Sequence, residues 1–486
     1  MARRVKRVFF TLAFFLGVSL TSSDDIKETE ATGKEDDGRV EQEALTWPPI
    51  GVTLEDDPSL WPGHLKPIGA NVPNKEVKVL NGFPPPEVFL RDYAIPSVPV
   101  LFKAAVTDSV AFKTWNSDEY FRQFPEAGTQ KHLIETRKKE IRTQPPTDMT
   151  LRQFLDRYSK EDIYMVEGVP KFLRKDVPMP KSLLCEPLTR MLVDTVMWFS
   201  SGGTKSVLHN DDVDNINCLY DGKKELVFIS YQRYRNKVTL DHPEGSYSSM
   251  DVDAVDFTKF PGMREVEYHR VNMSAGDCLY IPYRWFHQVN SYGRNIAVNV
   301  WWEHNLRQYV EALSEGCGDL AEDSTLNDFQ IEPPSDSSEQ GPLMELHSAL
   351  NAIKDKAVTL EEFEAIVKKD KLLTELITWT PKCSYAVKEM FEAIDRNKDS
   401  VLSQEDLEGL TDEMEEELDE VLMENMDDIM NIKNDQVAQL REAVAAEVAK
   451  GQAESYVELV KKLLDEGRTT IGDSDEVIGE HGHQEL

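Results

Sequence analysis

Residues 203–230 are GTKSVLHNDDVDNINCLYDGKKELVFIS, and this stretch decides which fold the chain adopts. A glycine-threonine turn is followed by a cluster of nitrogen and oxygen donors and then by two apolar runs. Along a strand, side chains i and i+2 point to the same face. His209 and Asp211 therefore offer an imidazole and a carboxylate to one point. We expect Asp212 and Asp214 to be turn residues, although with Asp211 they would also suit a cation-binding loop.

The sequence around this stretch is dense in predicted strands. Apolar, β-branched and aromatic runs predict strands at the segments DTVMWFSS, NINCLY, KELVFISY, DCLYIPY and NIAVNVWW. The Asp221-Gly222 dipeptide predicts a hairpin turn between the second and third of these runs. Short strands separated by frequent turns favour a β-sandwich or barrel. Before about Pro180 the pattern is mixed, with helices predicted at 117–124 and 150–158.

A third metal ligand has to come from elsewhere in the chain. Of ten histidines, His287 is the best placed, at the end of an apolar segment in GDCLYIPYRWFHQV. Two histidines and one carboxylate on one face of a metal, with three positions open, form the facial triad of non-heme Fe(II) oxygenases. Two open positions can take a chelating oxo acid, and Lys224, just past the predicted turn, would then bind its far carboxylate. The ordinary alternatives are a core histidine at 287 and a solvated lysine at 224.

Two long blocks, 203–230 and 273–302, together resemble the JmjC (cupin-type) family of Fe(II)/2-oxoglutarate oxygenases, in its small protein-hydroxylase branch. The resemblance extends from about Val77 to Glu303. It implies a mainly β catalytic domain, a double-stranded β-helix or jelly roll with flanking helices. It implies Fe(II) as cofactor, with 2-oxoglutarate and O2 as cosubstrates. By position, the resemblance assigns the iron ligands His209, Asp211 and His287, the 2-oxoglutarate anchor Lys224, and the cosubstrate-pocket residues Tyr164, Ser206, Asn215 and Asn299. Ser206 stands where relatives often have Thr, which keeps the hydroxyl.

Residues 395–406, DRNKDSVLSQED, match the calcium loop of an EF-hand. The predicted calcium ligands are Asp395, Asn397, Asp399, the carbonyl of Val401, Ser403 and Asp406. Ser400 replaces the usual turn glycine at a position that favours positive φ, so we expect strain there. Asp406 replaces the usual glutamate and has a shorter reach, which weakens calcium binding or favours magnesium.

The segment LMELHSALNAIKDKAVTLEEFEAIV keeps a helix-turn-helix rhythm but lacks early ligands, so we interpret it as a structural partner hand. The C-terminal third is strongly acidic: from Gly318 onward, 43 Asp and Glu stand against 15 Lys and Arg, which is −28 of the total charge of −34. An all-α EF-hand-like domain is therefore predicted, with an acidic helical bundle that binds no ion as the alternative. The chain has no basic patch, so nucleic acid is not an expected partner.

The N-terminus MARRVKRVFFTLAFFLGVSLTSS has the basic, apolar and small-residue order of a signal peptide, with a signal anchor as the alternative. We expect no stable membrane insertion after cleavage. The final HQEL resembles a retrieval signal of the endoplasmic reticulum (ER). The expected compartment is thus the ER lumen, with a retrieval receptor as partner, or else secretion. The predicted segments are 1–23 signal peptide, 24–46 polar linker, 47–308 oxygenase domain, 309–342 acidic linker, 343–470 EF-hand domain and 471–486 acidic tail.

Five cysteines permit one or two disulfides and leave at least one thiol over, with no pairing indicated. Asn272-Met273-Ser274 is a glycosylation sequon, usable only if exposed. The leading hypothesis is a lumenal 2-oxoglutarate-dependent dioxygenase that hydroxylates a protein side chain and carries a calcium-binding module. The alternatives are a catalytically silent calcium-binding ER scaffold, an N-methyl demethylase, and a cupin isomerase or metal-binding lectin. The sequence indicates neither the protein substrate nor the oligomeric state.

Overall fold

The computed structural model divides into two compact units, which we describe separately. One is Ala44–Pro334, and the other combines Ser335–Leu486 with Met1–Glu43. The structure describes residues 57–70, 74–140, 145–242, 246–318, 320–331, 357–369, 378–407, 410–450 and 455–465. The predicted signal peptide, the polar linker and the HQEL segment lie outside these residues. Within them, no helix has the length and apolar character needed to cross a bilayer.

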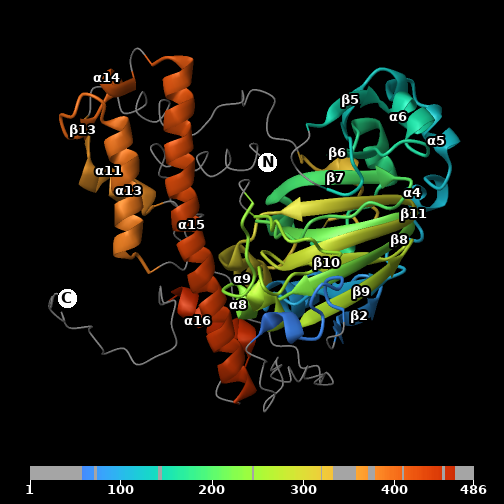
Figure 1. Cartoon of the computed structure of the whole chain (residues 1–486), viewed down its shortest axis with the longest axis horizontal. Coiled ribbons are helices and arrows are strands. Elements are labelled where there is room, and N and C mark those ends of the chain that lie inside the picture. The colour runs from blue at the N-terminus through green and yellow to red at the C-terminus, as the bar shows by residue number, and fades with distance from the viewer. Residues whose placement is uncertain are drawn as a thin grey trace. The chain divides into compact units, whose positions relative to one another are not determined.

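Two long strands organise the first unit. β8 (Asp214–Ile229) and β11 (Phe286–Trp302) run antiparallel and side by side (Figure 1). The first half of β8 also pairs with β10 (Cys278–Ile281), and its second half pairs with β9 (Tyr268–Ser274). The sheet order is β2-β3-β10-β8-β11-β7-β6-β4-β5, with β1 on β9. The remaining strands are β1 (Asn74–Glu76), β2 (Lys78–Asn81), β3 (Val100–Lys103), β4 (Lys131–Glu135), β5 (Thr147–Thr150), β6 (Tyr164–Gly168) and β7 (Leu192–Ser200).

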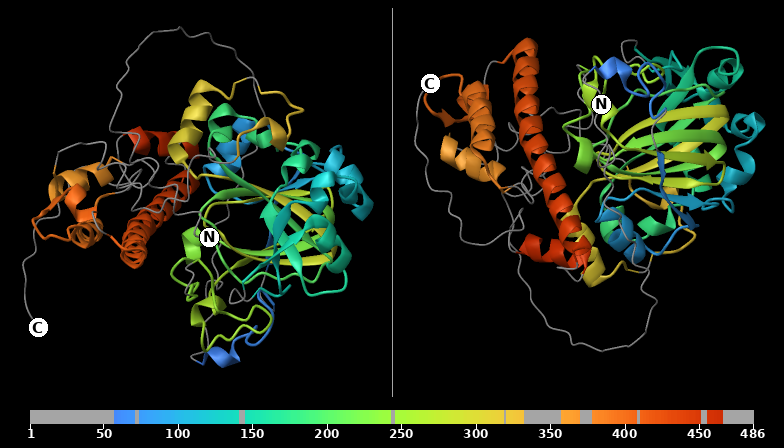
Figure 2. Two further views of the ribbon diagram at one scale, coloured as in Figure 1. Left: turned by 90° about the horizontal axis from the view of Figure 1, so that it is seen from above. Right: turned by 60° about the horizontal axis from the view of Figure 1, so that its bottom comes forward.

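This large mixed sheet is strongly curved (Figure 2) and is consistent with a cupin jelly roll. Its interior is filled by apolar side chains from several strands. They include Leu101, Leu219, Leu226, Phe228, Val271, Met273, Leu279, Ile281 and Ala297. The alternation of each strand sets which residues enter this core.

The predicted hairpin at Asp221-Gly222 is wrong, because β8 continues through it as one strand. Gly222 adopts φ +84°, and a Cβ there would lie 2.3 Å from the carbonyl oxygen of Arg294. The register with β11 shifts at this point, which marks a β-bulge. Because of the bulge, Leu219 before it and Leu226 after it both face the interior although their numbers differ in parity.

Short helices flank the sheet, and both helices predicted before Pro180 are present, as α5 (Asp118–Arg122) and α6 (Leu151–Arg157). Thr150 and Gln153 form a capping box at the start of α6. The other α-helices described in this unit are α3 (Pro86–Phe89), α4 (Val110–Thr114), α7 (Glu186–Thr189), α8 (Tyr231–Tyr234) and α9 (Leu306–Glu315).

The structure corrects the predicted linker 309–342. Its described residues, up to 331, belong to the first unit: α9 extends to Glu315, and Leu326 and Ile331 are buried. A disulfide between Cys185, directly before α7, and Cys317, shortly after α9, holds this segment near α7. The sequence predicted a linker here because the segment is polar on average. The buried Leu326 and Ile331 and the disulfide at Cys317 are too few residues to change that average.

The disulfide expectation is met with two bridges. Besides Cys185–Cys317, Cys218 of β8 is bonded to Cys278 of β10, directly across the sheet. The remaining thiol, Cys383, is free and buried in the second unit. Both bridges therefore crosslink the β-rich unit.

The second unit is helical. The helices in its described residues are α11 (Leu360–Val367), α13 (Pro381–Ile394), α14 (Gln404–Leu407), the 38-residue α15 (Asp412–Ala449; Figure 1) and α16 (Tyr456–Asp465). Apolar side chains of α11, α13 and α15 form one core that includes Phe363, Phe391 and Leu422. A two-residue ladder joins β12 (Val358–Thr359) to β13 (Val401–Leu402).

Candidate metal centre

The structure brings His209, Asp211 and His287 together. One ligand atom of each lies within 4.8 Å of the others, and no second group of three or more His, Cys, Asp or Glu with this property was found among the described residues. His287 Nε2 is 3.8 Å from Asp211 Oδ2, and the rings of His209 and His287 have centroids 4.2 Å apart. Three N and O ligands on one side of a point are the donor set that Fe(II) takes in a facial triad. The residues present therefore fit a ferrous ion.

Backbone pairing produces this convergence. His209 N donates to His287 O at 3.2 Å, and His287 N donates to His209 O at 2.8 Å. Arg284 N donates to Asp211 O at 3.0 Å, which extends the pairing to the third ligand. The segment after β7 is thus held against the start of β11, although about eighty residues separate the two histidines.

Both imidazoles are oriented by main-chain carbonyls. His209 Nδ1 lies 2.9 Å from Val207 O, and His287 Nδ1 lies 2.9 Å from Trp285 O. A proton on each Nδ1 satisfies these bonds and leaves Nε2 as a lone-pair donor for a metal. Burial, with a smaller contribution from the neighbouring His209, lowers the pKa of His287 to about 4, so this imidazole is neutral at physiological pH. A neutral imidazole is the form that binds a metal.

A strained residue supports the carboxylate ligand. Arg284 adopts φ +63°, a conformation uncommon outside glycine, just before β11. Its guanidinium forms an ion pair with Asp212, and its backbone N–H bonds to Asp211. Asp212 is therefore not merely a turn residue: its ion pair fixes the chain directly after the ligand.

Lys224 lies inside the sheet. It belongs to the same face of β8 as Leu226 and Phe228, and its side chain is 6% exposed. Its Nζ donates to Ser291 Oγ at 3.2 Å, and among the described residues no carboxylate pairs with it. Burial alone lowers the pKa of Lys224 from 10.5 to about 8. A buried ammonium with no anion is costly, so this position is suited to an incoming carboxylate.

The other predicted cosubstrate residues occupy the central strands. Asn299 accepts a hydrogen bond from Asn217. Asn215 lies on the same face of β8 as Asn217, and its Oδ1 accepts no hydrogen bond from the described residues. Tyr164 of β6 is buried and stacks on Trp198 with centroids 6.3 Å apart. Sequence reasoning missed Asn217 and Ser291. The i+2 spacing from Asn215 could have revealed the first, but nothing in the sequence indicates the second.

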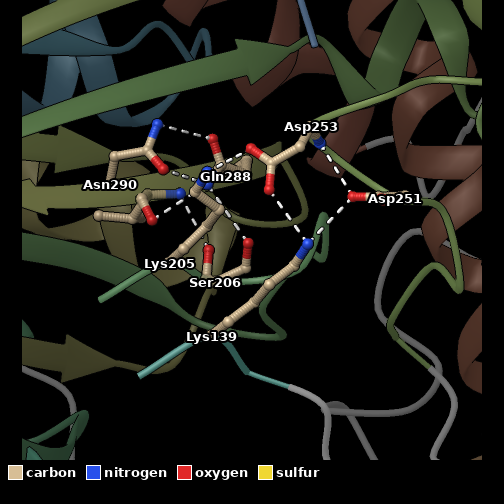
Figure 3. Close-up of polar contacts among 8 residues, drawn as sticks. Lys139, Lys205, Ser206, Asp251, Asp253, Gln288 and Asn290 are labelled. Carbon is tan, nitrogen blue, oxygen red and sulfur yellow. Dashed lines mark hydrogen bonds and ion pairs between the residues drawn. The ribbon is translucent and has the colours of Figure 1, made fainter. Parts of the chain in front are cut away.

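Ser206 lies at the edge of the candidate centre. It pairs with Val289, giving N–H to the Val289 carbonyl at 3.0 Å and accepting the Val289 N–H on Oγ at 2.9 Å. Figure 3 shows the surrounding polar contacts, in which Lys205 and Lys139 both reach Asp253, Lys139 at 3.0 Å. These ion pairs tie the loop that contains Asp253 to the segment that carries Ser206. In the same loop, Tyr247 stacks on His209 with centroids 5.6 Å apart.

Asp214, which we expected to be a turn residue, is fully buried as the first residue of β8. Its carboxylate accepts hydrogen bonds of 2.6 Å from both Tyr280 and Tyr309 and pairs with His304 at 2.6 Å. Burial opposes its ionisation, but His304 and the tyrosine hydroxyls outweigh burial and lower the pKa of Asp214. Asp214 therefore anchors the start of the strand that follows the two ligands.

The predicted calcium loop joins α13 to α14. Asp395 accepts from Ser400 N at 2.9 Å, Asp399 from Val401 N at 3.0 Å, and Asp406 from Ser403 N at 2.9 Å. Asn397 Oδ1 accepts from Asp399 N at 2.9 Å. Ser400 has φ +66°, the left-handed conformation anticipated for the glycine position. The carbonyl-bearing Val401 lies in the ladder to β12.

Residues 85–308 match the family model described as a cupin-like domain. Among curated proteins, the chain is 29% identical over 45% of its length to the Arabidopsis thaliana lysine-specific demethylase JMJ30, of which it covers 53%. It is 24% identical over 50% of its length to the human bifunctional peptidase and (3S)-lysyl hydroxylase JMJD7, of which it covers 90%. It is 31% identical over 30% of its length to the chicken tRNA wybutosine-synthesizing protein 5, covering 43% of it. The chain spans about half or less of the first curated relatives it matches.

Fold, site and relatives together define the class of protein that the first unit resembles: residues 85–308 form a cupin-like domain similar to JmjC enzymes, whose members are 2-oxoglutarate/Fe(II)-dependent oxygenases. The family model ends at residue 308 and does not extend into the helical unit. The EF-hand interpretation of that unit rests on the sequence and the geometry of the 395–406 loop.

Proposed function

We propose that this protein is an Fe(II)- and 2-oxoglutarate-dependent dioxygenase that hydroxylates a protein side chain in the secretory pathway. The observation that carries the proposal is the convergence of His209, Asp211 and His287 from two distant segments. When bound, a ferrous ion with 2-oxoglutarate and O2 supplies the oxidising power to convert a C–H bond to C–OH, with release of succinate and CO2.

The chain's own residues supply binding and orientation. The Nδ1 atoms of the two histidines bond to main-chain carbonyls, so a proton on each Nδ1 leaves Nε2 as the atom that can bind the metal. Lys224 provides a buried cation that suits the far carboxylate of 2-oxoglutarate, and Ser291 orients its ammonium. The apolar interior around Leu226 and Phe228 excludes water from this anion, which strengthens its interaction with Lys224.

Hydroxylation is favoured over N-methyl demethylation by the extent of the likeness. The chain covers 90% of the relative named as a lysyl hydroxylase, but 53% of the first demethylase. Both reactions begin with oxidation of a C–H bond, so the product separates them: a demethylase releases formaldehyde from a methylated peptide, whereas a hydroxylase retains the oxygen on the peptide.

The deciding experiment is Fe(II)- and 2-oxoglutarate-dependent succinate release by the purified full chain. We expect turnover in the wild type and its loss in His209→Ala. His242→Ala is the matched control, because His242 contacts Tyr247 but is not among the three converging ligands. Succinate release that persists in His209→Ala would refute the assignment. Metal-loaded protein that releases none would favour the alternative, a catalytically silent calcium-binding scaffold.

We further propose that Asp395, Asn397 and Asp399 hold calcium together with Val401, Ser403 and Asp406. The support is a loop with positive φ at Ser400 between two helices, and a ladder to a second short strand as in paired hands. Calcium titration by calorimetry tests it: Asp395→Ala should abolish the tight site. Asp428→Ala, which removes an exposed acid from α15, should leave it unchanged.

The proposed compartment is the ER lumen, with secretion as the alternative. Two disulfides in the β-rich unit favour an oxidising compartment. The basic and apolar order of residues 1–23 supplies the entry signal in this proposal. Protease protection of the protein in intact microsomes tests it, and digestion without detergent would refute it.

A further inference from the structure

The sequence contains a single Asn-x-Ser/Thr acceptor, Asn272-Met273-Ser274, and the structure places it in β9. We propose that Asn272 carries an N-linked oligosaccharide. The inference rests on the proposed function in one respect, the passage of the chain through the secretory pathway. It does not depend on the iron site.

Strand alternation directs the acceptor outward. Val271 and Met273 are 2% and 1% exposed and belong to the interior core of the sheet. Asn272 and Ser274, between and after them, are exposed on the opposite face. An oligosaccharide on Asn272 therefore projects away from the side of the sheet that holds Lys224.

The surroundings of Asn272 leave room for a bulky group. Its cross-strand neighbour is Glu225, a half-buried residue that forms an ion pair with Arg270. On the other edge, β1 pairs with β9 only as far as Arg270. The Asn272 side chain makes no hydrogen bond to a described residue, so its substitution by a sugar removes no contact that the fold uses.

The modification is a group transfer with a donor of known chemical class, a polyprenyl-diphosphate-linked oligosaccharide. The Nδ2 atom of Asn272 forms a bond to C1 of the first sugar and loses one proton to a base of the transferase. The bond between C1 and the diphosphate oxygen breaks, and the polyprenyl diphosphate leaves with its electron pair. No oxidant or reductant is needed.

The full chain, expressed with its N-terminal segment in eukaryotic cells, provides the test. Treatment with peptide-N-glycosidase should increase its electrophoretic mobility by one step and convert Asn272 to Asp, which peptide mass spectrometry detects. Ser274→Ala should abolish the shift, and Ser274→Thr, which keeps the hydroxyl, should retain it. Both are surface substitutions, so a loss of folding does not account for the difference.

A positive control separates the proposal that Asn272 is glycosylated from the proposal that the chain enters the secretory pathway. Glu322 has an exposed side chain, and Glu322→Asn with Ser324→Thr creates a second acceptor in the same unit. Modification at residue 322 without modification at Asn272 would overturn the Asn272 proposal and leave the compartment intact. Absence of modification at both positions would overturn both, while the succinate assay would still decide the oxygenase activity.

Discussion

Replacement of Lys224 by methionine should make the protein more stable and unable to bind 2-oxoglutarate. Methionine keeps the apolar stem of Lys224 but removes an ammonium that lies inside the sheet with no carboxylate partner among the residues that the structure describes. The matched control is Lys223→Met, because Lys223 is the next residue of β8, also a lysine, and exposed. The pair separates loss of a buried charge from loss of a surface charge.

The magnitude follows from the pKa of Lys224, which burial lowers from 10.5 to about 8. At about 1.4 kcal/mol per pKa unit, the charged side chain costs the folded protein about 3 kcal/mol at pH 7. Loss of the bond to Ser291 returns about 1 kcal/mol of this. The free energy of unfolding of Lys224→Met should therefore exceed that of the wild type by about 2 kcal/mol. With an unfolding entropy of roughly 2 cal/mol/K per residue, this corresponds to a rise of about 3 °C in Tm for a unit of this size.

The pH dependence gives a second check. Between pH 8 and 10.5 the unfolded chain keeps a proton on residue 224 that the folded chain has released, so wild-type stability rises with pH in this interval. The advantage of Lys224→Met should therefore shrink to near zero at about pH 9.5. Lys223→Met should show no such convergence with the wild type.

Thermal unfolding with Mn(II), without O2, with and without 2-oxoglutarate, measures both effects. The cosubstrate should raise the Tm of the wild type and of Lys223→Met, because it supplies the missing anion to Lys224. It should not raise the Tm of Lys224→Met. A lower Tm for Lys224→Met than for the wild type, or an equal shift with 2-oxoglutarate, would refute the assignment of Lys224 as the anchor.

Three further predictions concern the supports of the two sites. Arg284→Gly relieves a left-handed backbone conformation, which is worth about 1 kcal/mol, but it also removes the ion pair to Asp212, so the free energy of unfolding should change little. The affinity for Co(II), measured from the visible spectrum, should fall by up to about tenfold. An unchanged affinity would contradict this prediction. Asp214→Asn leaves His304 without its counter-charge and should lower the free energy of unfolding by about 3 kcal/mol at pH 7, measured in urea. Because the folded pKa of Asp214 is lowered, this wild-type advantage should be lost as the pH falls through that value. Ser400→Gly should tighten calcium binding several-fold in calorimetry, since glycine adopts φ +66° without strain; weaker binding than in Ser400→Ala would contradict the loop assignment.

The spacing of His209 and Asp211 on one extended segment allowed the sequence to indicate a metal pair. His287 followed from the small number of histidines and from its apolar context. The positions of the proposed calcium loop could likewise be predicted, because an EF-hand places its ligands within twelve consecutive residues, and calcium binding there stays a prediction. Local patterns of this kind survive in the sequence because their geometry is set by the backbone of one segment.

The β-bulge at Gly222 could not be predicted from a local sequence pattern. Strand alternation from Asp211 alone would place Lys224 on the opposite face, and the turn propensity of Asp221-Gly222 favoured a hairpin. The close approach of Gly222 to the Arg294 carbonyl and the register shift against β11 decide instead that β8 continues. Asp214 was misjudged for a similar reason, because its partners Tyr280, His304 and Tyr309 come from distant parts of the chain.

The sequence by itself determined which side chains were available for a ferrous ion and an oxo acid, and the segments that offer them. Only the tertiary structure decided that His209 and His287 exchange backbone hydrogen bonds, that Lys224 is buried with Ser291 as its described partner, and which four cysteines are bonded. The physical reason is that two strands far apart in sequence pair through contacts that no single segment contains. The one-residue register shift at the Gly222 bulge depends on the same kind of contacts.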